Sequence, residues 1–114
     1  MDRTVEQKSF HFAMRIVGLY RYLTETKKEF ILSKQLMRSG TSIGTNVAEA
    51  EQAQSRADFI AKLSIALKET AETNYWLRLL YATGYIQEAE FQSMYSNCVE
   101  LGKMLTAIIK SSKQ

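Results

Sequence analysis

The stretch that decides the fold is FQSMYSNCVELGKMLTAI, residues 91–108. Its apolar side chains recur at alternating steps of three and four residues, at Phe91, Met94, Cys98, Leu101, Leu105 and Ile108. Positions three and four apart share one face of a helix, so this spacing is typical of the seam along which a helix packs into a bundle. We therefore predict a helix over 88–110 with one well-defined buried face.

Three earlier segments show the same periodicity and predict helices over 5–25, 27–53 and 56–83. Three capping boxes mark their starts, and a glycine suited to the left-handed residue after a helix marks the end of the third. These marks are Thr4–Gln7, Thr26–Glu29, Ser55–Asp58 and Gly84. The chain has no proline, so nothing forces a break inside a helix. The pattern predicts an all-α, antiparallel up-down-up-down four-helix bundle, a single domain over 1–114.

Composition narrows the class of protein. A length of 114 residues suits one core, and 46% hydrophobic with 24% charged residues is ordinary for a globular chain. No apolar run approaches the ~20 residues that span a bilayer, and the first residues lack the apolar core of a signal peptide. With Cys98 as the single cysteine, no intrachain disulfide can form. We expect a cytoplasmic protein with no membrane partner.

Positive charge concentrates in the first part of the chain. Residues 1–45 hold eight Lys/Arg against four Asp/Glu, whereas residues 46–114 hold seven against eight. Two strips with helical spacing stand out: Lys8, Arg15 and Tyr22 in the first helix, and Lys27, Lys34 and Arg38 in the second. Together they predict a surface that binds the backbone of RNA or DNA, with Tyr22 available for stacking. The alternative is a pair of solvated helix faces whose charge serves solubility.

Two features suggest packing beyond an ordinary core. Gly40 and Gly44 each cost ~1 kcal/mol relative to Ala in an exposed helix interior, so we expect a neighbour to approach them closely. The segment YWLRLLY, residues 75–81, is apolar around nearly the whole helix, and its second face needs a partner. We predict a homo-oligomer or a stable complex with another protein, with an interface at Gly40, Gly44, Trp76, Leu79 and Leu80. The alternative is a thick core that covers these residues within one subunit.

The sequence offers no catalytic constellation. His11 is the one histidine, so the paired Glu-x-x-His motifs of a di-iron bundle cannot form. There is no Gly-rich phosphate loop and no Cys/His metal spacing. Glu49 and Glu72 could face each other as a catalytic pair, but acidic residues on helix surfaces are far commoner than such pairs. We predict a binding protein with no enzymatic activity, no cofactor and no metal.

Several blocks of the chain resemble a known bacterial family. They are EFILSKQLMRSGTSIGTN (29–46), VAEA (47–50), QSRADF (54–59), KLSIALKE (62–69) and ETNYWL (72–77). In this order they are similar to the bacterial four-helix bundle proteins also called 23S rRNA intervening-sequence, or S23, proteins. The wider family has Asn-Ile-Ala-Glu-Gly where this chain has NVAEA at 46–50, and often Gly-Ser where it has Lys68 and Glu69. These differences place the chain in a subgroup.

The resemblance implies a four-helix protomer that assembles into a barrel-like homopentamer. It also implies a likeness in shape to accessory proteins of diversity-generating retroelements, which bind nucleic acid and a reverse transcriptase. Two functions follow as hypotheses. The first is an oligomer that binds nucleic acid through its basic strips, and the second is an oligomer that binds or scaffolds proteins and has no nucleic-acid role.

Overall fold

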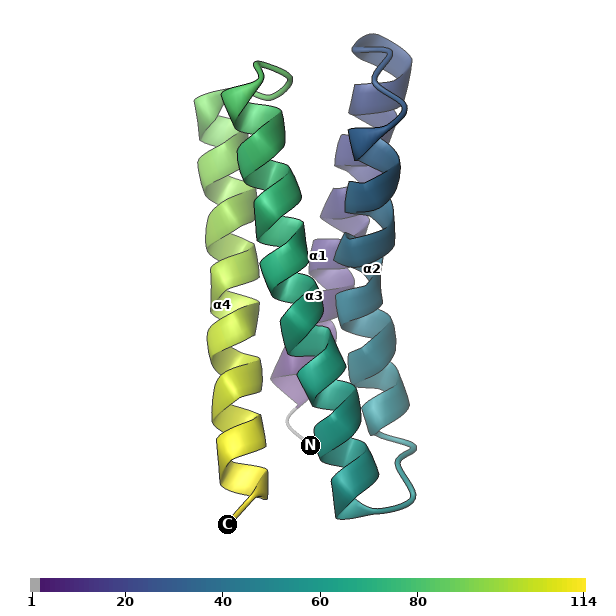
Figure 1. Ribbon diagram of the computed structural model, residues 1–114, viewed down its shortest axis with the longest axis vertical. Coiled ribbons are helices and arrows are strands. Elements are labelled where there is room, and N and C mark those ends of the chain that lie inside the picture. The colour runs from purple at the N-terminus through teal and green to yellow at the C-terminus, as the bar shows by residue number, and fades with distance from the viewer. Residues whose placement is uncertain (1–2) are drawn as a thin grey trace.

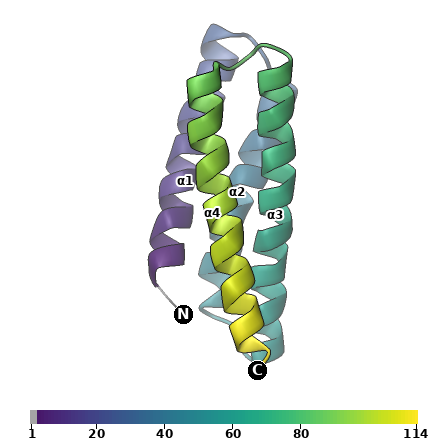
Figure 2. The same cartoon turned by 90° about the vertical axis from the view of Figure 1, so that its left-hand side faces the viewer.

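The computed structural model describes residues 3–114 and places four α-helices in that range (Figure 1). They are α1 (Arg3–Arg21), α2 (Leu32–Ala50), α3 (Arg56–Ala82) and α4 (Glu88–Ser112), and the described residues contain no strand. Each helix runs antiparallel to the one before it, and the bundle measures 45 × 20 × 19 Å. In the turned view α4 stands in front between α1 and α3, with α2 behind (Figure 2). The predicted up-down-up-down bundle is confirmed.

The core runs along the axis between the four helices. In α4, Phe91, Met94, Cys98, Leu101 and Leu105 are all buried, as their spacing predicts. The last turn differs, because Ile109 rather than Ile108 is buried there. The other helices contribute one stripe each to the same cluster: Val5, Phe12, Ile16, Leu19 and Leu23; Leu36, Ile43, Val47 and Ala50; Leu63, Ala66, Leu77 and Leu80.

The predicted ends of α3 are confirmed by their hydrogen bonds. The Ser55 hydroxyl accepts from the backbone N–H of Asp58 at 3.0 Å, and the Asp58 carboxylate accepts from the N–H of Gln54 at 3.3 Å. This is a capping arrangement that satisfies N–H groups at the helix start. After the helix, Gly84 has φ 85°, the left-handed conformation that glycine adopts without steric cost.

The link between α1 and α2 differs from the prediction. After α1 the chain forms a π-turn over Tyr22–Thr26, and Lys28 takes a positive φ of 55°. Helix α2 begins at Leu32 instead of residue 27 and ends at Ala50 instead of residue 53. The predicted box at Thr26–Glu29 is therefore wrong, because the π-turn holds Thr26. At the other end of the first helix, α1 begins at Arg3, ahead of the predicted cap Thr4.

The carboxylate of Glu29 performs the capping instead. It accepts from the backbone N–H groups of Ser33 at 2.7 Å, Leu32 at 3.0 Å and Ile31 at 3.1 Å. Burial has the largest single effect on this carboxyl and opposes its ionisation, but the donated hydrogen bonds together outweigh it. The pKa of Glu29 therefore lies below its ordinary value of 4.5, and the side chain is an anion at the positive end of α2.

Gly40 and Gly44 lie inside α2 and face α1. A Cβ atom on Gly40 would stand 2.7 Å from two carbon atoms of Ile16, and one on Gly44 would stand 3.4 Å from the carbonyl oxygen of Ser9. Real side chains are not found at 2.7 Å, so the absence of a side chain at Gly40 sets how closely α1 and α2 approach. The predicted close approach is confirmed at Gly40, and the neighbour is a helix of the same chain.

Candidate nucleic-acid interface

The basic strip of α1 faces α4. The ammonium of Lys8 lies 2.9 Å from the Glu100 carboxylate. The guanidinium of Arg15 donates to Asn97 at 2.6 Å and lies 3.9 Å from the carboxylate of Glu90. Two of the three residues in this strip therefore have acidic partners on α4, which weakens the positive field that the sequence pattern predicts.

The predicted strip of the second helix is divided, because Lys27 lies in the link before α2 and only Arg38 is paired with α3. Arg38 lies 3.5 Å from the Glu69 carboxylate and also pairs with Glu72, which in turn accepts from the indole N–H of Trp76 at 3.0 Å. Arg38 therefore faces α3, whereas Lys8 and Arg15 face α4. Paired cations of this kind still contribute charge, but each contact with a phosphate competes with an existing carboxylate.

Four further basic residues lie close together in the chain, around the link between α1 and α2. Lys27 lies over the ring of Tyr22, with its ammonium 5.9 Å from the ring centroid. Arg21 ends α1, Lys28 lies in the link, and Lys34 is in the first turn of α2. Within residues 3–114 these four cations have no carboxylate within ion-pair distance. Together with exposed Tyr22 and Phe30 they form what we call the basic end: Arg21, Tyr22, Lys27, Lys28, Phe30 and Lys34.

Sequence reasoning missed Arg21, Lys28 and Phe30 because it searched for regular steps along uninterrupted helices. Lys28 and Phe30 are in the link, where helical spacing has no meaning, and Phe30 is 61% exposed. Tyr22 was included in the α1 strip, yet it lies in the π-turn and approaches Lys27. The available signal was the pair Lys27-Lys28 standing between Tyr22 and Phe30, since cations near aromatic rings are typical of single-strand binding surfaces.

The residues predicted for an oligomer interface have varied surroundings. Leu80 is fully buried in the core of its own chain, and Gly40 is closed off by Ile16, so neither has surface left for another subunit. Gly44 is half-buried beneath α1. Trp76 and Leu79 are half-buried, and the ring of Trp76 meets that of Tyr75 edge to face at 5.1 Å.

Two other apolar areas are much more exposed. Phe10 and Met14, four residues apart on α1, are 66% and 53% exposed, and Tyr75 on α3 is 55% exposed. The two areas belong to different helices, α1 and α3, which stand on either side of α4 in Figure 2. We call them the α1 face (Phe10, Met14) and the α3 face (Tyr75).

Cys98 is buried, and each carboxylate of the pair considered for catalysis, Glu49 and Glu72, lies beside a cation. Burial raises the pKa of Cys98 to about 12, and its thiol donates to the carbonyl of Thr70 at 3.4 Å. Glu49 pairs with Lys62 at 3.1 Å and Glu72 with Arg38, so each carboxylate of the considered pair has a cation of its own. Among the described residues, no three His, Cys, Asp or Glu side chains cluster as metal ligands would.

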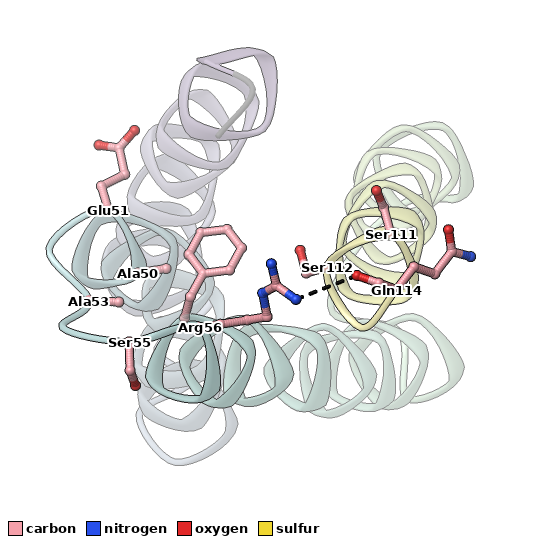
Figure 3. A pocket seen from close by; sticks show the side chains of 9 residues that line it. Ala50, Glu51, Ala53, Ser55, Arg56, Ser111, Ser112 and Gln114 are labelled. Carbon is pink, nitrogen blue, oxygen red and sulfur yellow. Dashed lines mark hydrogen bonds between the residues drawn. The ribbon is translucent and has the colours of Figure 1, made fainter.

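An opening at the end of the bundle where the chain terminates has a volume of about 580 Å³. Figure 3 shows Arg56 pointing across it toward α4, where its guanidinium donates to the backbone carbonyl of Gln114 at 3.4 Å. Its charged lining side chains are Arg56 and Glu51. A single cation beside an anion gives a polyanion little to bind, so the basic end remains the better candidate.

The fold defines the class: an all-α protein built as an antiparallel four-helix bundle. Residues 1–107 match the family described as 23S rRNA-intervening sequence protein, and the chain belongs to this family. It is also similar to a crystal structure from Bacteroides thetaiotaomicron, described as a protein with unknown function from the S23 ribosomal protein family. The two are 57% identical with a TM-score of 0.95, over 96% of this chain and 97% of that one.

No curated protein matches the chain in sequence. No helix among the described residues has the length and apolar character needed to cross a bilayer.

Proposed function

We propose that the protein is a non-enzymatic, self-associating protein that binds RNA or DNA through its basic end. The observation that carries the proposal is the set of four cations without carboxylate partners, Arg21, Lys27, Lys28 and Lys34, beside two exposed rings. Unpaired cations bind phosphates without first giving up an ion pair, and the rings of Tyr22 and Phe30 can stack on unpaired bases.

Self-association strengthens such binding. One basic end makes few contacts, and nonspecific affinities at physiological salt are typically ~10⁻⁴ to 10⁻⁶ M. Several copies acting on one polyanion raise the effective concentration, and avidity can exceed single-site affinity by roughly a hundredfold or more. The homopentamer implied by the family resemblance would provide five such ends.

The test is a titration of labelled hairpin RNA and duplex DNA from about 50 mM to physiological salt. Replacing Lys27, Lys28 and Lys34 together with Gln removes three cations without touching the core. For duplex DNA we expect the slope of log K against log salt to fall by about 2 to 3, because each phosphate contact contributes about 0.9.

The matched control replaces Lys8, Arg15 and Arg38 with Gln, which makes the same change in net charge at residues that already have acidic partners. We expect this variant to keep most of the native slope. Equal losses in the two triple variants would show that only net charge matters. If the native protein binds neither probe at about 50 mM salt, the proposal that it binds nucleic acid is wrong.

A second candidate function, scaffolding of copies or of another protein, is favoured by the α1 face and the α3 face. Three large apolar side chains more than half exposed, Phe10, Met14 and Tyr75, are more than a monomer's surface needs, and such patches mark interaction sites. Contact between the α1 face of one copy and the α3 face of the next joins two different surfaces and is heterologous, and such contacts form a ring when the rotation between copies closes.

A further inference from the structure

A long groove runs between α3 and α4 on the outside of the bundle, separate from the basic end. It has a volume of about 650 Å³. Its floor is apolar and its walls are low, because small residues stand where larger side chains would fill it: Ala71 on α3, and Gly102 and Ala107 on α4. A Cβ atom on Gly102 would meet Thr70 at no less than 3.4 Å, so packing against α3 does not require a glycine there.

The charged residues of this groove all have one sign. Lys68 from α3 and Lys103 and Lys110 from α4 are its ionisable lining residues apart from the buried Cys98 thiol. None of the three lysines forms an ion pair within the described part of the chain. The nearby acid on α4, Glu100, points away to Lys8 on α1. The groove is therefore an apolar surface flanked by three unneutralised cations.

One polar atom in the lining also lacks a partner. The side-chain oxygen of Asn74 is buried, and no hydrogen-bond donor reaches it from the described residues. Because this oxygen is closed off from solvent, it offers no contact to an incoming chain. What the groove presents to a partner is therefore apolar area and positive charge.

We propose that this α3–α4 groove docks an acidic amphipathic helix of another protein. The apolar side of that helix would lie on Leu67, Ala71 and Val99, which line the groove. Its carboxylates would meet Lys68, Lys103 and Lys110 at the edges. Small residues let a helix backbone approach closely, and helix-in-groove recognition uses apolar anchors one turn apart flanked by complementary charge.

Nucleic acid fits this surface less well. The groove lining contains no aromatic ring on which a base could stack, and the apolar floor between the lysines gives nothing to phosphates. The basic end has the opposite character, with rings and cations interleaved. The inference is therefore independent of the proposed function and can fail or hold without it.

The experiment measures fluorescence anisotropy of a labelled peptide of ~18 residues, long enough for five helical turns, titrated with the intact protein. The peptide carries Leu and Ala on one face and Glu on the other. A second peptide of the same composition has its order scrambled, so its charge is equal but it has no apolar face. We expect the amphipathic peptide to bind at least about tenfold more tightly than the scrambled one, because only it can bury apolar area in the groove.

Charge reversal then locates the site. Replacing Lys68, Lys103 and Lys110 with Glu should weaken binding of the amphipathic peptide by about tenfold or more. As the matched control, the same reversal at Lys27, Lys28 and Lys34 should change it by less than about threefold. Circular dichroism and thermal melting of both variants verify that the fold is intact. A separate variant, Ala107→Trp, fills the groove at an exposed position and should block the peptide without altering charge.

Three results would overturn the proposal. Equal binding of the scrambled peptide would reduce the interaction to net charge. Loss of hairpin RNA binding in the groove variant, with displacement of the peptide by RNA, would make the groove a nucleic-acid surface. Absence of peptide binding, with cross-links joining the groove to the α1 face of a second copy, would assign it to self-association.

Discussion

At the scale of single residues, Glu29 is the side chain on which the α1–α2 link depends most. Its carboxylate replaces the missing helical partners of three N–H groups at the start of α2, and the residue is buried. The same link holds Lys28 in the left-handed region, which a residue with a Cβ adopts at a cost. One buried anion thus fixes the conformation in which the basic end presents its cations.

We expect Glu29→Gln to lower the free energy of unfolding by about 1–2 kcal/mol near pH 7, because a neutral amide is a weaker cap than a carboxylate. The pKa of Glu29 is lowered by folding, so its contribution is complete above the ordinary value of 4.5. It is lost as pH falls through the lower folded-state pKa. Urea denaturation across this range should show the two proteins converging in acid. Glu25→Gln, at an exposed carboxyl in the π-turn, is the control.

Two glycines should respond oppositely to the same substitution. Gly40→Ala forces a methyl group against Ile16, and we expect a loss of ~1–3 kcal/mol despite the better helix propensity of alanine. Gly18 is exposed in α1 with no atom near a new Cβ, so Gly18→Ala should stabilise by up to ~1 kcal/mol. The stabilities of the two variants are compared through their midpoints of denaturant unfolding. Equal stability of the two variants would refute the tight contact at Gly40.

At the scale of elements, the sequence predicted the helices well wherever local chemistry determines them. Helices α3 and α4 begin and end within two residues of their predicted limits, because Ser55 and Gly84 act through neighbours in the chain. The α1–α2 link was predicted poorly, because Glu29 satisfies the spacing of a capping box without occupying its usual position. A π-turn has no sequence signature as strong as a cap.

The candidate site was harder to predict than the helices. Spacing correctly placed Lys8 and Arg15 on one side of α1, but it could not show that this side faces acidic residues of α4. Which face of a helix meets which neighbour depends on the whole bundle. A strip of cations in sequence is therefore evidence of a shared face and not of a free surface.

The packing of α3 against α4 can be measured through the reactivity of the Cys98 thiol. With a pKa of about 12, only ~10⁻⁴ of this thiol is ionised at pH 8, and its sulfur is fully buried between the two helices. We expect iodoacetamide to label native protein orders of magnitude more slowly than a free cysteine, with the rate rising in sub-denaturing urea as the helices separate. Labelling at the rate of a free thiol without denaturant would contradict the close α3–α4 packing.

At the scale of the whole molecule, the α1 face is a candidate surface for self-association. Phe10 and Met14 are exposed, so replacing both with Glu should leave the protomer folded. If the α1 face contacts a second copy, the two buried charges should dissociate the assembly to a 13.1 kDa species. Sedimentation velocity at micromolar concentration is the measurement.

The matched control replaces Phe30 and Ile31, an apolar pair next to the basic end that is 61% and 76% exposed, with Glu. It makes the same charge change away from the α1 face and should leave the assembly intact. Native protein sedimenting as a single 13.1 kDa species would contradict self-association and the gain in avidity that we propose for nucleic-acid binding.

The direction of the chain has a practical consequence for all of these measurements. Each helix runs opposite to the one before it, so residue 114 lies at the end of the bundle where α1 starts. The α1–α2 link lies at the opposite end (Figure 1). A biotin tag or a fluorescent reporter joined at residue 114 is therefore held about one bundle length, 45 Å, from Lys27 and Lys28. Protein immobilised in this way on a sensor chip would keep its basic end directed toward the solution.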